Sequence, residues 1–433
     1  MNDELERKIR FRTSVARAHS QAVSGISGTL MVKEGPSYDG RAGELFKIVL
    51  ANLMLTFITA GIYRFWAKTR VRRYFLSRAS FLGDRLEYTG TGKELFLGFL
   101  IVLAILMPVY IVYQFVSNAT FGTSAFAAIQ VGYFVLFYFL FFVATYRARR
   151  YRLSRTMWRG IRGGQTGSAM LYAVHGMIWS TITVLTFGLA YPVMRLKLQA
   201  YKTDRMTFGN RTFSFDGGIG PLLGAWLLPW FGLVVAATPF ALLMMDVDFD
   251  ALTAGNSAKL PEMSGTRGAY GILIIAGIGI FLLTQFWYRA AEVRHFAAST
   301  EFDELRFDSS LSGFNVFWPY FFYGLLLILL WGGAIAITAA IISAVALTPG
   351  TSAGQAGEIA GTIGGYAGVI TLLVVLVIGG TLKPIIVHNR LFRAFCHTLT
   401  LQGSFSPDRL LQSQLNIPQR GEGLADALDV DAF

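Results

Sequence analysis

Residues 63–74 read YRFWAKTRVRRY, a basic and aromatic tail that directly follows an apolar stretch. Similar tails follow apolar stretches four more times, at 146–151, 195–201, 288–296 and 388–395. Each tail leads into a short polar segment that contains small or turn-forming residues. The recurrence predicts an internal duplication, and the apolar stretches that precede the tails predict a membrane protein.

The overall composition also indicates a membrane protein. Of the 433 residues, 54% are hydrophobic and only 15% are charged, whereas about 25% of residues are charged in a typical soluble protein. The formal net charge of +12 comes largely from Lys and Arg residues beside the apolar stretches, where cytoplasmic loops of membrane proteins are basic in any case. We therefore expect no nucleic-acid partner. The polar N-terminal sequence lacks the apolar core of a secretory signal, so we do not expect a secreted product.

Eight apolar stretches are long enough, or nearly so, to form membrane helices. They lie at about 45–63, 95–117, 125–146, 169–194, 220–245, 269–288, 314–346 and 364–387. The segments after the first, third and fourth stretches are strongly basic, which assigns all three to the cytoplasm. The basic segments after the third and fourth stretches can both be cytoplasmic only if the stretch between them, at 169–194, enters the membrane and returns on the same side. The same argument for its counterpart at 45–63 predicts six crossings, two returning segments and two cytoplasmic termini.

Both returning stretches contain a glycine at the same place. Gly61 lies within Thr59-Ala60-Gly61-Ile62-Tyr63, and Gly188 lies within Thr186-Phe187-Gly188-Leu189-Ala190, with Pro192 two residues further on. Glycine and proline interrupt helices, so Gly61, Gly188 and Pro192 are candidate helix-break residues. The alternative interpretation is an ordinary tilted span that happens to contain a glycine.

The segments that follow the tails predict short β-hairpins. Gly83-Asp84 and Gly209-Asn210 supply the positive φ of a tight turn, and aromatic residues alternate with polar ones on either side. Weaker versions lie at 157–167, 300–308 and 399–405. We therefore predict an all-α polytopic membrane protein, an internally duplicated helical bundle with short cytoplasmic β-hairpins.

This interpretation divides the chain into five parts. They are a polar cytoplasmic N-terminal segment at 1–42, a first membrane repeat at 43–168, a second at 169–313, a C-terminal membrane hairpin at 314–405 and a flexible tail at 406–433.

The sequence contains no cluster typical of catalysis or of a metal site. The five histidines lack paired ligand spacing, Cys396 is the single cysteine, and no Asp or Glu lies deep in an apolar stretch. We therefore expect no enzymatic activity, no metal and no cofactor.

The arginine rows of the tails are the best binding candidates. Arginine interleaved with aromatic residues at the membrane boundary suits anionic phospholipid headgroups. The candidate headgroup residues are Arg70, Arg73, Arg147, Arg149, Arg150 and Arg152. The alternative explanation is that these basic residues only set the orientation of the helices in the membrane and bind no specific lipid.

A glycine row at the start of the last stretch predicts close helix packing. Gly357, Gly361 and Gly365 repeat at the i, i+4 spacing of one helix face. Small residues let helix backbones approach, either within the chain or between copies in a homo-oligomer.

The first unit also carries a recognisable set of motifs. They are Gly43-Glu44-Leu45-Phe46-Lys47-Ile48, Thr59-Ala60-Gly61-Ile62-Tyr63-Arg64-Phe65-Trp66-Ala67-Lys68, Gly83-Asp84-Arg85 and Tyr88-Thr89-Gly90-Thr91-Gly92. With these motifs the chain resembles the YjgN family of bacterial inner-membrane proteins, a group defined by sequence without an assigned activity. The resemblance covers about 43–404 and implies an integral protein of the bacterial inner membrane. It supplies no reaction and no catalytic residue.

Two hypotheses for the function follow. The first is a transporter or channel-like protein for a small solute, which the duplication and the returning segments favour. The alternative is a non-transporting membrane component that binds anionic lipids or partner proteins through its arginine-rich cytoplasmic face.

Overall fold

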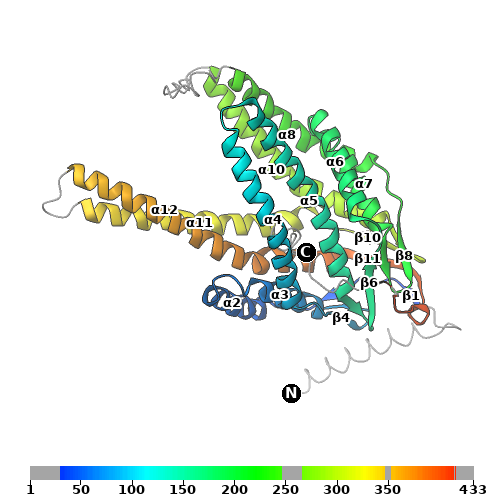
Figure 1. Cartoon of the computed structure of the whole chain (residues 1–433). Coiled ribbons are helices and arrows are strands. Elements are labelled where there is room, and N and C mark those ends of the chain that lie inside the picture. The colour runs from blue at the N-terminus through cyan, green and yellow to red at the C-terminus, as the bar shows by residue number, and fades with distance from the viewer. Residues whose placement is uncertain (1–29, 246–265, 347–352, 414, 416–433) are drawn as a thin grey trace.

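Helical hairpins extend from one antiparallel β-sheet in the computed structural model of the protein (Figure 1). The structure describes residues 30–245, 266–346, 353–413 and 415. The expectations for the first 29 residues and for the tail beyond 415 lie outside the described residues.

The sheet has eleven strands and curves into a half-barrel. The strands are β1 (Leu30–Val32), β2 (Ser37–Tyr38), β3 (Ala79–Phe81), β4 (Asp84–Tyr88), β5 (Thr156–Trp158), β6 (Ile161–Gln165), β7 (Met206–Phe208), β8 (Arg211–Phe215), β9 (Thr300–Phe302), β10 (Leu305–Ser309) and β11 (Leu399–Phe405). Their order is β1-β11-β10-β9-β8-β7-β6-β5-β4-β3-β2, and every neighbouring pair is antiparallel.

The expectation of an all-α protein is therefore wrong, because the eleven strands form one extensive sheet. Hairpins form after the first four tails, whereas the hairpin expected at 399–405 is wrong, because these residues form the single strand β11, which pairs with β1 and β10. The outer edges of the hairpins also pair with one another, as in the contact of Leu86 with Trp158. An isolated hairpin is marginally stable, and an open strand edge offers unpaired backbone groups to a neighbour. Fusing the hairpins into one sheet satisfies those groups.

The turn of the first hairpin differs by one residue from the expected turn. Leu82 and Gly83 have φ values of +49° and +82°, whereas Asp84 already pairs with Phe81 in the ladder. Two positive φ values in a two-residue loop match the twist of the flanking strands. In the third hairpin, Gly209 has a φ of +58° and lies in the expected turn.

A row of aromatic rings forms the core of the half-barrel. Each of four hairpins ends its first strand with an aromatic residue: Phe81, Trp158, Phe208 and Phe302. Successive ring centroids lie 5.6, 6.2 and 6.2 Å apart. Phe405 of β11 lies 6.1 Å from the Trp158 ring and 6.3 Å from the Phe302 ring. This row joins hairpins from distant parts of the chain.

Five of the helices are long and apolar enough to cross a membrane, judged by the length and composition of the described residues: α4 (Gly92–Ala119), α5 (Ser124–Arg155), α8 (Gly220–Met245), α10 (Thr266–Ala298) and α11 (Gly313–Ala346). The other helices are α2 (Ala42–Ile58), α3 (Arg64–Ser77), α6 (Ala169–Leu185), α7 (Tyr191–Thr203), α12 (Ala353–Lys383) and α13 (Asn389–Thr398). A π-helix (Pro384–His388) joins α12 to α13, and a 3₁₀-helix (Pro407–Arg409) follows β11. The crossing expected at 364–387, which falls mainly on α12, stays a prediction.

The long helices form two diverging arms. Helices α11 and α12 pack together as one hairpin, which points away from the hairpins α4–α5 and α8–α10 (Figure 1). Along both arms many large apolar side chains are exposed, for example Ile111, Ile275 and Ile328. Apolar surface of this extent is expected where lipid covers the protein.

The helix pairs α2–α3 and α6–α7 each leave the sheet and return to it. Strand β2 precedes α2 and pairs with β3, which follows α3. Strand β6 precedes α6 and pairs with β7, which follows α7. Each pair therefore forms a hairpin, not one continuous helix. The position of these hairpins relative to the bilayer stays a prediction, as does the division of the chain into two repeats.

The two short hairpins turn in the same way. Gly61 and Gly188 have φ values of +92° and +86°, which favour glycine. The Gly61 N–H donates to the Thr56 carbonyl at 2.8 Å, and the Gly188 N–H donates to the Thr183 carbonyl at 2.7 Å. Pro192 is the second residue of α7, a position in the first turn where proline fits a helix.

Candidate functional site

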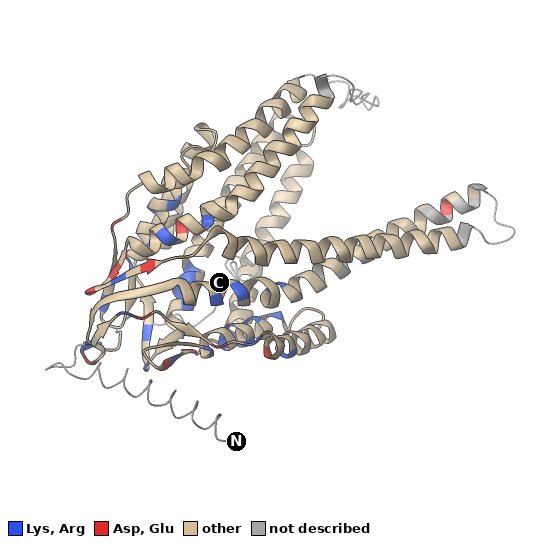
Figure 2. Cartoon of the chain, turned by 180° about the vertical axis from the view of Figure 1, so that it is seen from behind, with Lys and Arg blue, Asp and Glu red and all other residues tan. Residues whose placement is uncertain are grey.

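The basic tails form the ends of five helices at the sheet. Helices α3, α5, α7, α10 and α13 carry the tails, and each leads into a strand, namely β3, β5, β7, β9 and β11. Figure 2 shows that Lys and Arg residues gather where the helices meet the sheet, whereas the far ends of the helices are almost without them. Because each tail helix leads directly into a strand, basic residues from distant parts of the sequence lie close to the same sheet.

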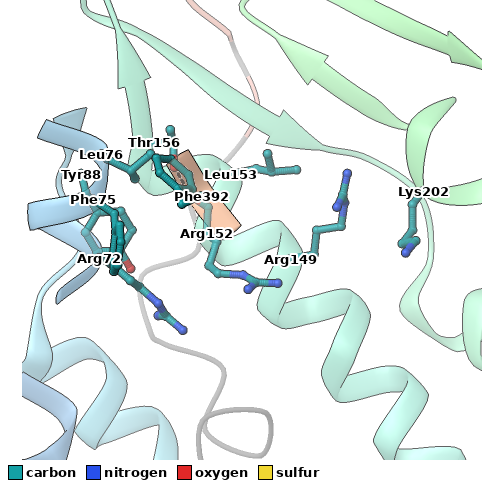
Figure 3. Close-up of a pocket in the computed structure, with 10 residues that line it drawn as sticks. All are labelled: Arg72, Phe75, Leu76, Tyr88, Arg149, Arg152, Leu153, Thr156, Lys202 and Phe392. Carbon is teal, nitrogen blue, oxygen red and sulfur yellow. Dashed lines mark hydrogen bonds between the residues drawn. The ribbon is translucent and has the colours of Figure 1, made fainter. Parts of the chain in front are cut away.

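Four of these cations surround one cavity of about 380 Å³. Its lining residues are Arg72, Phe75, Leu76, Tyr88, Arg149, Arg152, Leu153, Thr156, Lys202 and Phe392 (Figure 3). We call this cavity the basic chamber. The cations come from three helices: Arg72 from α3, Arg149 and Arg152 from α5, and Lys202 from α7. Among the described residues that line the chamber there is no Asp or Glu.

Helical spacing explains why these residues share the chamber. On α5, Arg149, Arg152 and Leu153 stand at i, i+3 and i+4. Residues at these spacings lie on one helix face. On α3, the residues at 72, 75 and 76 repeat the same spacing. Figure 3 shows Arg72 and Arg152 extending in the same direction from their two helices.

The wall of the chamber is partly aromatic. Tyr88 at the end of β4 is 5% exposed, and its hydroxyl has no hydrogen-bond partner among the described residues. A buried hydroxyl without a partner is costly, which makes it a candidate ligand contact. The Nη2 atom of Arg149 lies 3.3 Å from the Met206 sulfur of β7. The strand residues Tyr88 and Thr156 and residues of several helices thus line the chamber together.

The six candidate headgroup arginines fall into different environments. Arg149 and Arg152 line the basic chamber. Arg70 donates to Asn52 Oδ1 at 3.1 Å and to the Tyr63 hydroxyl at 3.0 Å, which ties α3 to α2 and to the turn. These bonds give Arg70 a structural role within the first hairpin.

The other three candidates also lie away from the chamber. Arg73 donates to the Gly90 carbonyl at 3.3 Å, and Arg147 is exposed on α5. Arg150 donates to the Gly167 carbonyl, and its guanidinium lies 5.6 Å from the centre of the Tyr146 ring. The structure therefore brings together two of the six candidates.

Two chamber cations were not among the predicted binding residues. Arg72 lies between two predicted candidates, and Lys202 lies beyond the end of the third tail. Both belong to the basic segments that the topology argument used. Their spacing alone does not show that they face residues of α5, because that depends on how three helices pack.

The glycine row of α12 does not pack within the described chain. A Cβ atom placed on Gly357, Gly361 or Gly365 meets no atom within 4 Å, apart from the helix itself. Packing between copies therefore stays a prediction. Among the described residues, no group of three His, Cys, Asp or Glu side chains is arranged to hold a metal ion.

A family of bacterial proteins of unknown function (DUF898) matches residues 34–427. The chain belongs to this family. Two inner membrane proteins named YjgN are similar to part of the chain. The protein of Salmonella typhimurium is 38% identical over 68 residues, 16% of this chain and 17% of the relative. The protein of Escherichia coli O157:H7 is 36% identical over 76 residues, 17% of this chain and 19% of the relative.

The matched part thus spans less than a fifth of each curated relative. No solved structure matches the chain. The expected membership of the YjgN family is confirmed, and with its apolar helices the chain is an inner membrane protein.

Proposed function

We propose that the protein binds an anionic, phosphate-bearing ligand in the basic chamber at the cytoplasmic boundary of the inner membrane. The observation that supports this function is the convergence of Arg72, Arg149, Arg152 and Lys202 on one cavity. Arginine binds phosphate oxygens through paired, charge-assisted hydrogen bonds.

The charge distribution supports a cytoplasmic position for the chamber. Basic residues gather at the sheet side of the helices (Figure 2), and basic residues beside membrane helices are enriched on the cytoplasmic side. Both described ends of the chain lie on this side, because β1 pairs with β11 in the sheet. The ligand is then either a lipid headgroup of the cytoplasmic leaflet or a soluble phosphate compound.

A charge-removal experiment tests this function. The variant Arg149→Gln/Arg152→Gln removes two chamber cations, and Arg211→Gln/Arg306→Gln removes two cations on the sheet, whose side chains are 43% and 81% exposed. Purified protein in a neutral detergent is titrated with phosphatidylglycerol and with phosphatidylcholine, and bound lipid is counted by native mass spectrometry.

The chamber variant should bind phosphatidylglycerol about 100-fold more weakly, because each charged hydrogen bond contributes about 1.5 kcal/mol or more and 1.4 kcal/mol is about tenfold in affinity. The control variant should keep the preference for the anionic lipid. Equal preference in the two variants, or no preference in the native protein, rejects the proposal.

Transport of an anionic solute is a second candidate function. The chamber lies between α3 and α7, the returning helices of the two short hairpins, which is where a substrate site between repeats is expected. Phosphate flux into proteoliposomes should then fall in the variant Arg72→Gln/Lys202→Gln. Flux that is no higher than in protein-free liposomes removes this candidate.

A further inference from the structure

A second cavity adjoins the basic chamber and has a different character. It measures about 580 Å³ and lies among α2, α3, α11, α12 and the π-helix. Arg72 lines both cavities. We call the second cavity the amphiphilic groove. Both cavities have the volume of ordinary small-molecule sites, which is about 300–1,000 Å³.

The lining of the groove combines apolar and cationic side chains. The apolar part includes Val49, Leu53, Val71, Leu327, Val375 and Val377, and the basic part consists of Arg64, Lys68, Arg72, Lys383 and His388. Inorganic phosphate and small hydrophilic phosphate compounds have no apolar group to fill the apolar part. An anionic lipid has groups for both, because its acyl chain is apolar and its phosphate pairs with Arg and Lys.

The neighbourhood of the groove suits access from the bilayer. Helix α2 lines the groove with Leu53 and Thr56, and the adjacent side chains Met54, Phe57 and Ile58 are 53%, 85% and 76% exposed. Large apolar side chains exposed at the tip of a hairpin in a membrane protein are expected to contact lipid. An acyl chain then reaches the groove without crossing water.

The groove also contains an unusual backbone feature. Pro384 and His388, the first and last residues of the π-helix, both line it. Single π-turns are rare and occur frequently at functional sites. The π-helix here connects α12, which belongs to the diverging arm, to α13, which leads into strand β11 of the sheet.

From these features we propose that the ligand is an anionic phospholipid that lies across both cavities. An acyl chain occupies the apolar part of the groove, the phosphate lies against Arg72 where the cavities adjoin, and the rest of the headgroup enters the basic chamber. This inference rests on the proposed function and names its ligand class. It assigns to the diverging α11–α12 hairpin the role of a wall for the lipid chain.

Filling the groove from α12 tests the inference. Gly380 lines the groove, and a Cβ atom placed on it meets no atom within 4 Å. The variant Gly380→Phe therefore adds a ring without an immediate clash. The matched control Gly368→Phe changes an exposed glycine of the same helix that also has open space and does not line the groove. Leu53→Trp narrows the groove from α2 and serves as a second variant.

The probes are dioleoyl and dihexanoyl phosphatidylglycerol, which share a headgroup and differ in chain length. Full-length native protein in neutral detergent should bind the dioleoyl lipid far more tightly, by about fourfold for each buried methylene. Gly380→Phe and Leu53→Trp should weaken dioleoyl binding at least about tenfold and leave dihexanoyl binding unchanged. The control Gly368→Phe should bind both lipids as the native protein does.

The possible failures are distinguishable. If the two lipids bind equally well, or if the groove variants behave like the control, the ligand is not held by an acyl chain and this inference is wrong. The proposed function then survives as long as anionic lipid is still preferred to phosphatidylcholine and Arg149→Gln/Arg152→Gln abolishes that preference. Loss of the charge preference in native protein rejects the function itself.

Discussion

Replacing Glu292 with Gln should destabilise the protein far more than an equivalent change on the surface. The Glu292 side chain is 3% exposed and accepts bonds from Arg195 Nε at 2.5 Å and from Arg289 Nη1 at 2.8 Å. Arg195 belongs to α7 and Glu292 to α10, so this carboxylate ties the returning hairpin to a long helix. A buried carboxylate is tolerated because two guanidinium groups compensate its charge.

The expected loss is about 3 kcal/mol of unfolding free energy, the lower end of the range of about 3–5 kcal/mol for breaking a buried ion pair. The lower end applies because the side chains of Arg195 and Arg289 are 32% and 46% exposed. Glu301→Gln is the matched control, since it also removes one carboxylate. Its pair with Arg306 has side chains 46% and 81% exposed, and exposed pairs contribute less than about 1 kcal/mol.

Denaturant titration of the two variants in the same detergent measures the difference. Adding Arg195→Met to Glu292→Gln should restore part of the stability, because it removes the cation that the first change leaves without its carboxylate. If Glu292→Gln costs no more than Glu301→Gln, the buried ion pair does not hold α7 to α10.

Three further predictions concern the sheet, the hairpin tips and the cysteine. Trp158→Ala should cost about 3–5 kcal/mol, because this ring is 5% exposed at the centre of the aromatic row; a cost like that of Trp331→Ala, where the ring is 40% exposed, contradicts the core assignment. Phe57→Trp and Phe187→Trp should be quenched by brominated lipid chains, since these side chains are 85% and 81% exposed at the tips; quenching only by aqueous iodide contradicts membrane contact. Burial raises the pKa of the Cys396 thiol to about 11, so the thiol stays protonated at neutral pH and maleimide should label it only after unfolding; fast labelling of folded protein contradicts this.

The returning hairpins show how far topology reasoning reaches. Basic segments on both sides of 169–194 predict a segment that returns to the same side of the membrane. The structure shows that α6 and α7 form a helical hairpin between two paired strands, and its place relative to the bilayer stays a prediction. The sidedness signal is local, because it depends on charges next to apolar stretches. Turn residues are also a local signal, and they predicted the hairpin turns near Gly83 and Gly209. The first turn lies at Leu82 and Gly83, one residue before the expected position.

The sheet was beyond local reasoning. Each hairpin has a recognisable turn, but the pairing of β4 with β5 joins residues about 70 positions apart, such as Leu86 and Trp158. No turn signal marks such a contact. It arises because several marginal hairpins with open edges stand at the ends of neighbouring helices.

The sequence alone determined the apolar helices, the basic helix ends, the tight turns and the family, because each depends on residues that are neighbours in the chain. Only the tertiary structure decided which arginines form the chamber. Arg72 lines it together with Arg149 and Arg152, whereas Arg70, two positions away, bonds to Asn52 of α2 and Arg73 bonds to the Gly90 carbonyl beyond β4. Each residue turns a helix side chain by about 100°, so the packing angle of three helices selects the face that meets the ligand.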